Sequence, residues 1–249
     1  MDALEDSPAP RYLPIDRNQI RLHPLDVERL IDSDHPARKI WRVVSQLDLS
    51  GFEADARAVA GRAGRPGHSP HLLVSIWISA YSKGLHSARE IARQAEYEPG
   101  WQWLTALRPV NHHCLSDFRV QHGEALRELF EQVLAMLTKN KLITFERVAV
   151  DGTKIRADVN RKSFSKAANL RKHLKPAIER FDEKMQRAEA QAIYKRRAPL
   201  AEFPNAWIKT KLKLRRFATR GLRKVQCEAT WAALTFNLQR MFRLAPELA

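Results

Sequence analysis

The chain has 249 residues, of which 44% are hydrophobic and 29% are charged, with 9 glycines and 13 prolines. This composition excludes a collagen-like chain, a wholly disordered chain and a small domain held together by disulfides. The two cysteines, Cys114 and Cys227, provide neither a disulfide framework nor a zinc-finger spacing. The acidic N-terminus does not resemble a signal peptide, and the longest apolar stretch, Leu72 to Tyr81, is too short to span a bilayer. We therefore expect a cytoplasmic protein.

The net charge of +15 is concentrated in one part of the chain. Residues 151–226 contain 22 Lys and Arg against 7 Asp and Glu, whereas the remaining 173 residues contain 21 of each sign. Such a segment favours polyanions, because contacts with phosphates release condensed counterions. We predict that it contacts nucleic acid. The alternative is a solvated helical face that only keeps the protein soluble.

In chain order, residues 1–30 are polar and contain several prolines, which predicts a loosely packed arm. Apolar residues at steps of three and four, together with capping residues, predict a series of helices after the arm. These helices cover residues 37–47, 70–83, 87–97, 115–121 and 124–139. Trp101, Trp103 and Leu104 are expected in a short turn. Short polar connections favour packing of the helices into a compact bundle.

The pattern changes after Glu146. Residues 147–153 form a β-branched run that ends in Asp151-Gly152, and they are the one convincing strand prediction. Residues 154–198 are basic and helix-prone, and a last amphipathic helix follows them. Its expected buried positions are Leu222, Val225, Ala229, Ala232 and Phe236. We predict a mainly α protein with an arm over 1–30, a helical domain over 31–142 and a strongly basic part over 143–249.

Two blocks in the basic part contain the acids of greatest interest. Asp151 ends the predicted strand in the block VAVDGTKI (148–155), and Glu202 lies in the block AEFPNAWIK (201–209). These blocks resemble the first-aspartate and glutamate blocks of bacterial insertion-sequence DDE transposases. Further blocks occur in the family's order, so that the resemblance covers most of residues 20–242. They are 47–52, 87–91, 113–119, 214–217, 220–222 and 237–238.

The resemblance implies an N-terminal helical bundle followed by an RNase H-like α/β domain. In this family two Asp and one Glu hold Mg²⁺ ions, which support DNA cleavage and strand transfer. Asp151 matches the first Asp and Glu202 matches the Glu, so the resemblance implies that both are catalytic and bind the metal. The implied cofactor is therefore Mg²⁺, and the implied partner is the terminal-repeat DNA of a transposon.

The resemblance also indicates DNA-contacting cations. Tyr194, Arg197, Glu202 and Lys209 resemble the Tyr-Arg-Glu-Lys signature of this class, with one extra residue between Arg and Glu. Arg197 would contact phosphate as a fork and Lys209 as a point charge. The cations of the other matching blocks are further candidates for DNA binding. They are Lys154, Arg215, Arg216 and Arg220.

The helical domain contains a second candidate for DNA contact. The predicted helices 87–97 and 115–121 resemble a helix-turn-helix pair joined by a longer linker than usual. The residues that would reach DNA are Asn111, His112, His113, Ser116 and Arg119. A packing role in the core is the alternative, because this domain is neutral overall.

The second Asp of the family has no counterpart with the right context. Only 50 residues lie between Asp151 and Glu202, and further strands, a helix and the second Asp would have to fit there. Residues 154–198 show no strand pattern, and their acids lie in polar, helix-prone sequence. We therefore expect an internally deleted chain whose RNase H-like remnant has one or two strands and basic helices. Weak Mg²⁺ binding and loss of cleavage and strand transfer follow.

The sequence is compatible with three functions. The chain is a DNA-binding transposase-family protein with an incomplete active site, a non-catalytic regulator that binds intact transposase subunits, or a product that folds only partially. The expected partners are DNA and either further copies of the chain or full-length transposase, and no membrane. Binding to DNA would place the protein on the nucleoid.

Overall fold

The computed structural model describes residues 24–53, 66–144, 155–156 and 202–248, together with a few positions between 179 and 192. The predicted mainly α fold is confirmed, and β pairing in these ranges is a single bridge between Arg156 and Arg216. The predicted strand over 147–153 lies outside the described residues. Among the described helices, none combines the length and apolar character that crossing a membrane requires.

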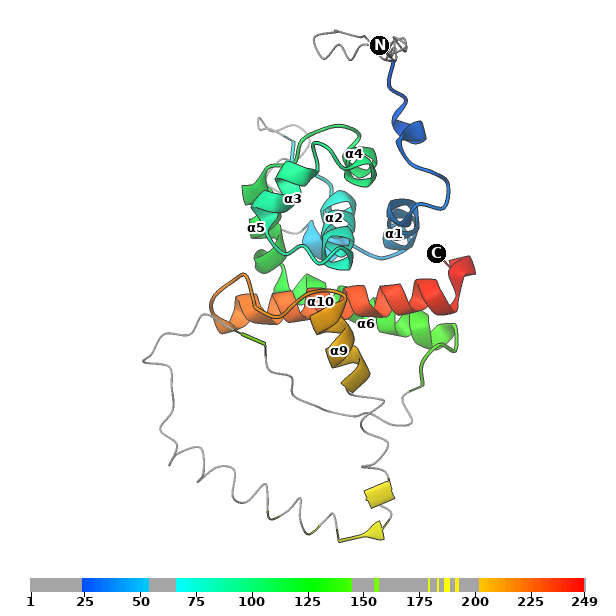
Figure 1. Cartoon of the computed structure of the whole chain (residues 1–249), viewed down its shortest axis with the longest axis vertical. Coiled ribbons are helices and arrows are strands. Elements are labelled where there is room, and N and C mark those ends of the chain that lie inside the picture. Colours follow the sequence, from blue (N-terminus) through cyan, green and yellow to red (C-terminus); the bar gives the residue numbers. More distant parts are fainter. Residues whose placement is uncertain are drawn as a thin grey trace, which may run out of the picture.

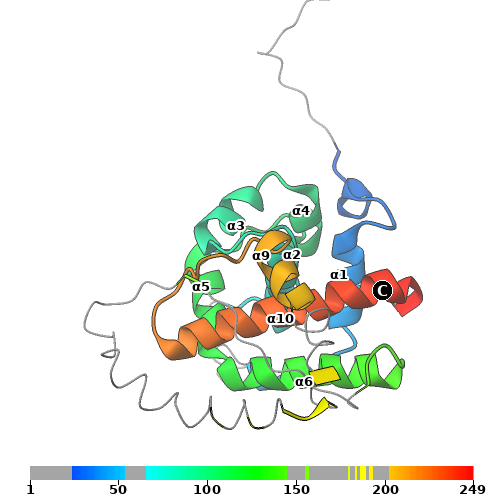
Figure 2. The same cartoon turned by 60° about the horizontal axis from the view of Figure 1, so that its bottom comes forward.

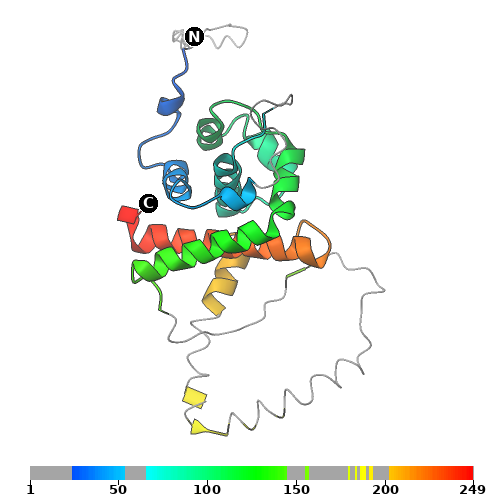
Figure 3. The same ribbon diagram turned by 180° about the vertical axis from the view of Figure 1, so that it is seen from behind.

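The described elements are, in chain order, η1 (Val27–Leu30), α1 (Pro36–Val44), η2 (Ser50–Phe52), α2 (Pro70–Ser82), α3 (Ala88–Gln94), α4 (Pro99–Thr105), α5 (His112–Gln121), α6 (Gly123–Lys139), α9 (Phe203–Thr210), α10 (Leu222–Leu244) and η5 (Pro246–Leu248). Helices α1 to α5 form one layer, and the long helices α6 and α10 lie side by side beneath them (Figures 1 and 3). Helices α6 and α10 run in the same direction. Their N-terminal ends are in contact, because a Cβ atom placed on Gly123 of α6 would lie 3.5 Å from Sγ of Cys227 in α10.

Helix α2 lies in the centre of the bundle. Its residues from Leu73 to Tyr81 are buried on every side, so that α2 is a core helix and not, as its spacing predicted, a helix with one buried face. Two indoles fix its position: Trp77 Nε1 donates to the carbonyl of Leu115 (3.1 Å), and Trp101 Nε1 donates to Ser79 Oγ (2.9 Å). Trp101 belongs to helix α4, where a short turn was predicted.

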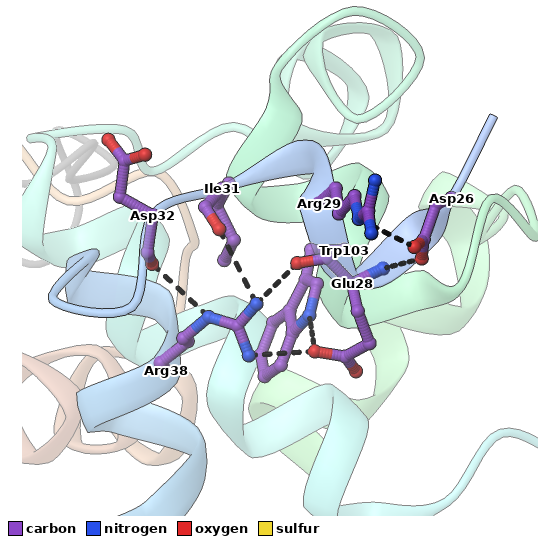
Figure 4. A network of polar contacts seen from close by, with 7 residues as sticks. All are labelled: Asp26, Glu28, Arg29, Ile31, Asp32, Arg38 and Trp103. Atoms are coloured by element: carbon purple, nitrogen blue, oxygen red, sulfur yellow. Dashed lines mark hydrogen bonds and ion pairs between the residues drawn. The ribbon is translucent and has the colours of Figure 1, made fainter.

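The junction between the predicted arm and the bundle is ordered by Arg38 (Figure 4). Its guanidinium donates to the Glu28 carboxylate (2.7 Å) and to the Asp32 carbonyl (3.2 Å), and it stacks on Trp103 at 4.8 Å from the ring centroid. Trp103 Nε1 also donates to Glu28 (3.1 Å), and Arg38 and Trp103, in that order, hold the pKa of the Glu28 carboxyl below its usual range. Residues 26–31 are therefore attached to α1 and α4.

Helix α10 belongs to the same hydrophobic core as α1 to α6, although it lies beyond residue 143, where we predicted the basic part to begin. Its buried face is only partly the predicted one, since Ala232 is buried but Leu222 and Ala229 are exposed. The buried residues are Cys227, Glu228, Trp231, Ala232, Leu234, Thr235, Leu238 and Met241. The prediction missed part of this face because it contains a charged residue, Glu228.

Glu228 forms a buried ion pair with Arg119 of α5. Their side chains are 0% and 5% exposed, and Nη1 of Arg119 lies 3.9 Å from Oε1 of Glu228. Arg119 also donates to the carbonyl of His86 (2.6 Å) and lies over the Trp77 ring at 4.7 Å. The other oxygen of Glu228 accepts from the backbone N–H of Ala218 (2.9 Å). The pair thus joins α5, α10 and the connection before α10.

Removing one member of this pair should cost far more than removing both. We expect Arg119→Met to lower the free energy of unfolding by about 3–5 kcal/mol, because Glu228 remains buried without a cation. The double variant Arg119→Met/Glu228→Gln should recover part of this loss, since Gln still accepts from Ala218. Urea unfolding curves measure the free energy of unfolding of both variants. The control is Arg127→Met, which breaks the exposed ion pair with Glu124 and should change this free energy by less than about 1 kcal/mol. Equal losses for the single variant and the control would contradict the assignment.

The stability should fall as the solution becomes mildly acidic. Burial, the largest influence, lowers the pKa of His86, and the Arg119 charge adds to it, whereas Glu228 opposes it. The unfolded chain therefore binds a proton at His86 more readily than the folded chain, and stability decreases once the pH falls below about 6.5. Melting temperatures between pH 7.5 and 5.5 should decrease in the wild type and change less in His86→Gln. An identical pH profile for the two proteins would exclude His86 as the cause.

Candidate nucleic-acid interface

The connection from α9 to α10 carries a dense set of cations. Between Phe203 and Cys227 the sequence contains eight Lys and Arg and no Asp or Glu. We call these eight residues the basic strip: Lys209, Lys211, Lys213, Arg215, Arg216, Arg220, Arg223 and Lys224. All are exposed except Lys209, which is half-buried. The strip therefore concentrates positive charge in one short and largely exposed stretch of the chain.

An alternating pattern explains why these cations face solvent. Helix α9 ends at Thr210, and in the chain that follows, the leucines at 212 and 214 are fully buried while the cations at 211, 213 and 215 are exposed. The N–H of Leu214 donates to the carbonyl of Ile208 (3.0 Å), which folds this segment back onto α9. The segment is turned and not extended, since Lys213 has a left-handed φ of +55° and the N–H of Arg215 donates to the carbonyl of Lys213 (2.9 Å). These turns place the leucines in the core and leave the cations on the surface.

Two contacts hold the strip against the bundle, and a third is formed within the strip. The stem of Lys213 lies on Gly84 at the end of α2, where a Cβ would come within 2.7 Å of Lys213 Cδ and where φ is +71°. Ala218 is bonded to the buried Glu228, as described above, and Nε of Arg215 donates to the carbonyl of Lys209 (3.4 Å). The cations are therefore displayed on a fixed backbone.

A short piece of the chain after the predicted strand also reaches the strip. The N–H of Arg156 donates to the carbonyl of Arg215 (3.1 Å), and the N–H of Phe217 donates to the carbonyl of Arg156 (2.9 Å). Arg156 is exposed, so that it adds a further cation beside Arg216. This parallel pairing brings the chain to the strip five residues after Asp151.

The residues predicted to form the site fall into two groups. Glu202 is exposed and directly precedes α9, while Lys209, Arg215, Arg216 and Arg220 all belong to the basic strip. The others lie outside the described residues: Asp151, Lys154, Tyr194 and Arg197. The structure thus brings together the cations that follow Glu202.

Several cations of this surface were not singled out from the sequence. They are Arg156, Lys211, Lys213, Arg223 and Lys224. The signal for Lys211 and Lys213 was the alternation of Lys with Leu over 211–214, which is typical of a chain segment with one buried side. Arg156 had no such signal, because its place depends on pairing with a segment far along the sequence.

Of the two acids predicted to bind magnesium, Asp151 and Glu202, only Glu202 lies among the described residues. Hard divalent cations take six or more oxygen ligands, several of them usually carboxylates that converge. Within the described ranges there is no group of three or more His, Cys, Asp or Glu side chains that could hold a metal. The described residues by themselves do not fit a magnesium site, and we derive no metal-dependent step from them.

The second predicted DNA contact, on α3 and α5, requires a correction. Arg119 is enclosed in the core by Glu228, Trp77 and the His86 carbonyl, and its side chain is only 5% exposed. Asn111 is the N-cap of α5, and its side chain accepts a hydrogen bond from the N–H of His113 (2.8 Å). Helices α3 and α5 pack together, but α4 lies between them in the chain. Arg119 therefore has a structural role, the alternative that the sequence had left open.

Comparisons with known proteins identify the family of the chain. A family model described as a transposase DDE domain matches residues 138–242, a range that contains Asp151, Glu202 and the basic strip. A second model, described as a transposase domain (DUF772), matches residues 25–121, which include α1 to α5. Neither a curated protein nor a solved structure matches the chain. The two models follow one another in the order that the sequence blocks predicted, and the chain belongs to the insertion-sequence DDE transposases.

Proposed function

We propose that this member of the transposase family binds transposon-end DNA through the basic strip. The observation that supports the proposal is the fixed display of eight cations without an acid among them, seven of them exposed. A cluster of this kind attracts the DNA backbone at long range and releases counterions on contact. The strip also lies in the part of the chain that the DDE-domain model matches.

We prefer the strip to the α3–α5 pair as the main DNA-binding surface. The residues outside the basic segment carry equal numbers of positive and negative charges, so that the bundle has little net attraction for phosphates. Of the predicted contacts, Arg119 is enclosed in the core, and the exposed side chain of Asn111 already caps α5. In the strip, by contrast, the side chains of Lys211, Arg223 and Lys224 are exposed at the surface.

We also propose that the family reaction, Mg²⁺-dependent cleavage and strand transfer, is lost in this chain. The support is the short interval of 50 residues between Asp151 and Glu202, whose sequence shows no strand pattern to present a second Asp. Glu202 is exposed and belongs to no three-ligand group among the described residues. With a carboxylate missing, the metal ions would bind weakly and the attacking group would not be held in line.

The proposed partners follow from these two points. Terminal-repeat DNA is the ligand of the strip, and further copies of the chain or full-length transposase subunits are the protein partners proposed for assembly on it. Binding of DNA by the strip would place the protein on the nucleoid in the cytoplasm.

The strip predicts a specific salt dependence of DNA binding. Arg215→Gln/Arg216→Gln should reduce the slope of log K against log salt concentration by about 2, since each phosphate contact contributes about 0.9. Fluorescence anisotropy with a short labelled duplex from the terminal repeat, over about 50 to 200 mM salt, measures this slope.

The matched control is Arg29→Gln/Arg243→Gln, which removes the same charge from η1 and from the far end of α10. It should leave the slope unchanged. Equal effects of the two double variants would mean that net charge and not the strip determines binding, and the proposal would then fail.

Loss of the reaction is tested with the purified protein, Mg²⁺ or Mn²⁺ and terminal-repeat DNA. We expect no nicking or strand transfer above background, because one acid of the metal cage is missing. Product formation is followed on denaturing gels, with Asp151→Ala and Glu202→Ala assayed in parallel. Cleavage by the wild type that disappears in Asp151→Ala would show that the active site is complete after all.

A further inference from the structure

A partly exposed aromatic cluster lies where α9 packs on α10. The ring centroids of Phe203, Trp207 and Phe236 are 5.6 to 6.4 Å apart. None of the residues of α9, all of which the structure describes, is fully buried, and Phe203 is 41% exposed. Helix α9 projects from α10 away from the layer formed by α1 to α5 (Figures 1 and 3). In Figure 2, where this side of the molecule comes forward, α9 lies in front of α10. An aromatic ring is therefore presented to solvent at the start of the segment that carries the strip.

The cluster is held in one arrangement before any ligand arrives. Cζ of Arg240 lies 5.3 Å from the centroid of the Phe203 ring, so that a cation covers part of the ring. The indole of Trp207 donates from Nε1 to Oε1 of Gln239 (2.9 Å), which fixes its orientation against α10. A side chain that is already fixed loses little conformational entropy on binding, which favours a planar ligand.

We propose that Phe203, supported by Arg240, is a stacking platform for an unpaired base of single-stranded DNA. The phosphates of the same strand would bind the basic strip, so this inference rests on the proposed DNA-binding function and adds a site for a base. A cationic track beside an exposed aromatic ring is the combination that binds single strands, because every base has a π-face. Lys209 follows Phe203 by about 9 Å along α9, close enough for neighbouring nucleotides to contact both.

The charge of the surface favours a nucleic acid over a second copy of the chain. Residues 203–227 contain eight cations and no acid, so that two copies docked face to face through this cluster would bring like charges together. A DNA strand has the complementary charge and supplies planar rings. The aromatic cluster and the strip therefore have a common ligand.

The test compares single-stranded and duplex DNA with the full chain. Phe203→Ala should weaken binding of labelled oligo(dT) by about 5- to 100-fold, the loss expected for one stacked base. Phe203→Leu, which keeps apolar packing but has no ring, should show a similar loss, and Phe203→Trp should retain binding. Affinity for a duplex of the same length should change by less than about twofold in all three. Fluorescence anisotropy measures every case.

Tyr97→Ala is the matched control, because it removes an exposed aromatic ring in the turn after α3, outside the basic strip. It should leave oligo(dT) binding unchanged. The proposal is overturned if the wild type does not bind oligo(dT), if Phe203→Leu binds it as the wild type does, or if duplex affinity falls equally. A concentration-dependent dimer that Phe203→Ala abolishes, with oligo(dT) binding intact, would instead make a second copy the occupant. Failure of the wild type to bind duplex would contradict the proposed function itself.

Discussion

Burial of one face of α10 against α2, α5 and α6 is the interaction on which the rest of the structure depends. The indole of Trp231 shows how this burial is achieved, because its ring lies 6.5 Å from that of Trp77 and its Nε1 donates to the carbonyl of Arg119 (3.2 Å). These contacts join residues more than a hundred positions apart. The two regions matched by separate family models therefore share a core, to which α10 contributes one side.

The position of the basic strip follows from this packing. Helix α10 carries α9 on its outer side and Glu228 on its buried side, and Glu228 holds the connection at Ala218. Gly84 lets the stem of Lys213 approach the end of α2 closely. The cations are consequently presented by a rigid scaffold, which reduces the conformational cost of ordering them on a phosphate backbone. The proposed DNA-binding surface does not require a complete metal site, so the proposed DNA binding is compatible with the proposed loss of cleavage.

The sequence predicted the elements with strong local signals and missed features that depend on distant contacts. The helices near α1, α2 and α6 follow from apolar spacing with capping residues, and the resemblance of sequence blocks indicated the family. The buried face of α10 was partly misplaced, and Arg119 was assigned to DNA, for a common physical reason. A sequence pattern places a charged side chain at the surface unless a partner for it is known. Arg119 and Glu228 are far apart in the sequence and become partners only in the folded chain.

The candidate site was predictable to a similar extent. The excess of cations was plain from counting, and the matching blocks pointed to Glu202 and to four strip residues. The exact surface was not, because it depends on burial of the leucines at 212 and 214 and on the pairing of Arg156 with the strip. Pairing of Asp151 with Glu202 stays a prediction, since Asp151 lies outside the described residues.

Hydrogen–deuterium exchange with and without terminal-repeat duplex tests most directly which surface contacts DNA. We expect DNA to slow exchange in residues 209–224 and to leave α3 and α5 unchanged. Slower exchange over 88–121, with residues 209–224 unaffected, would show instead that the helical bundle contacts DNA and that the basic strip does not.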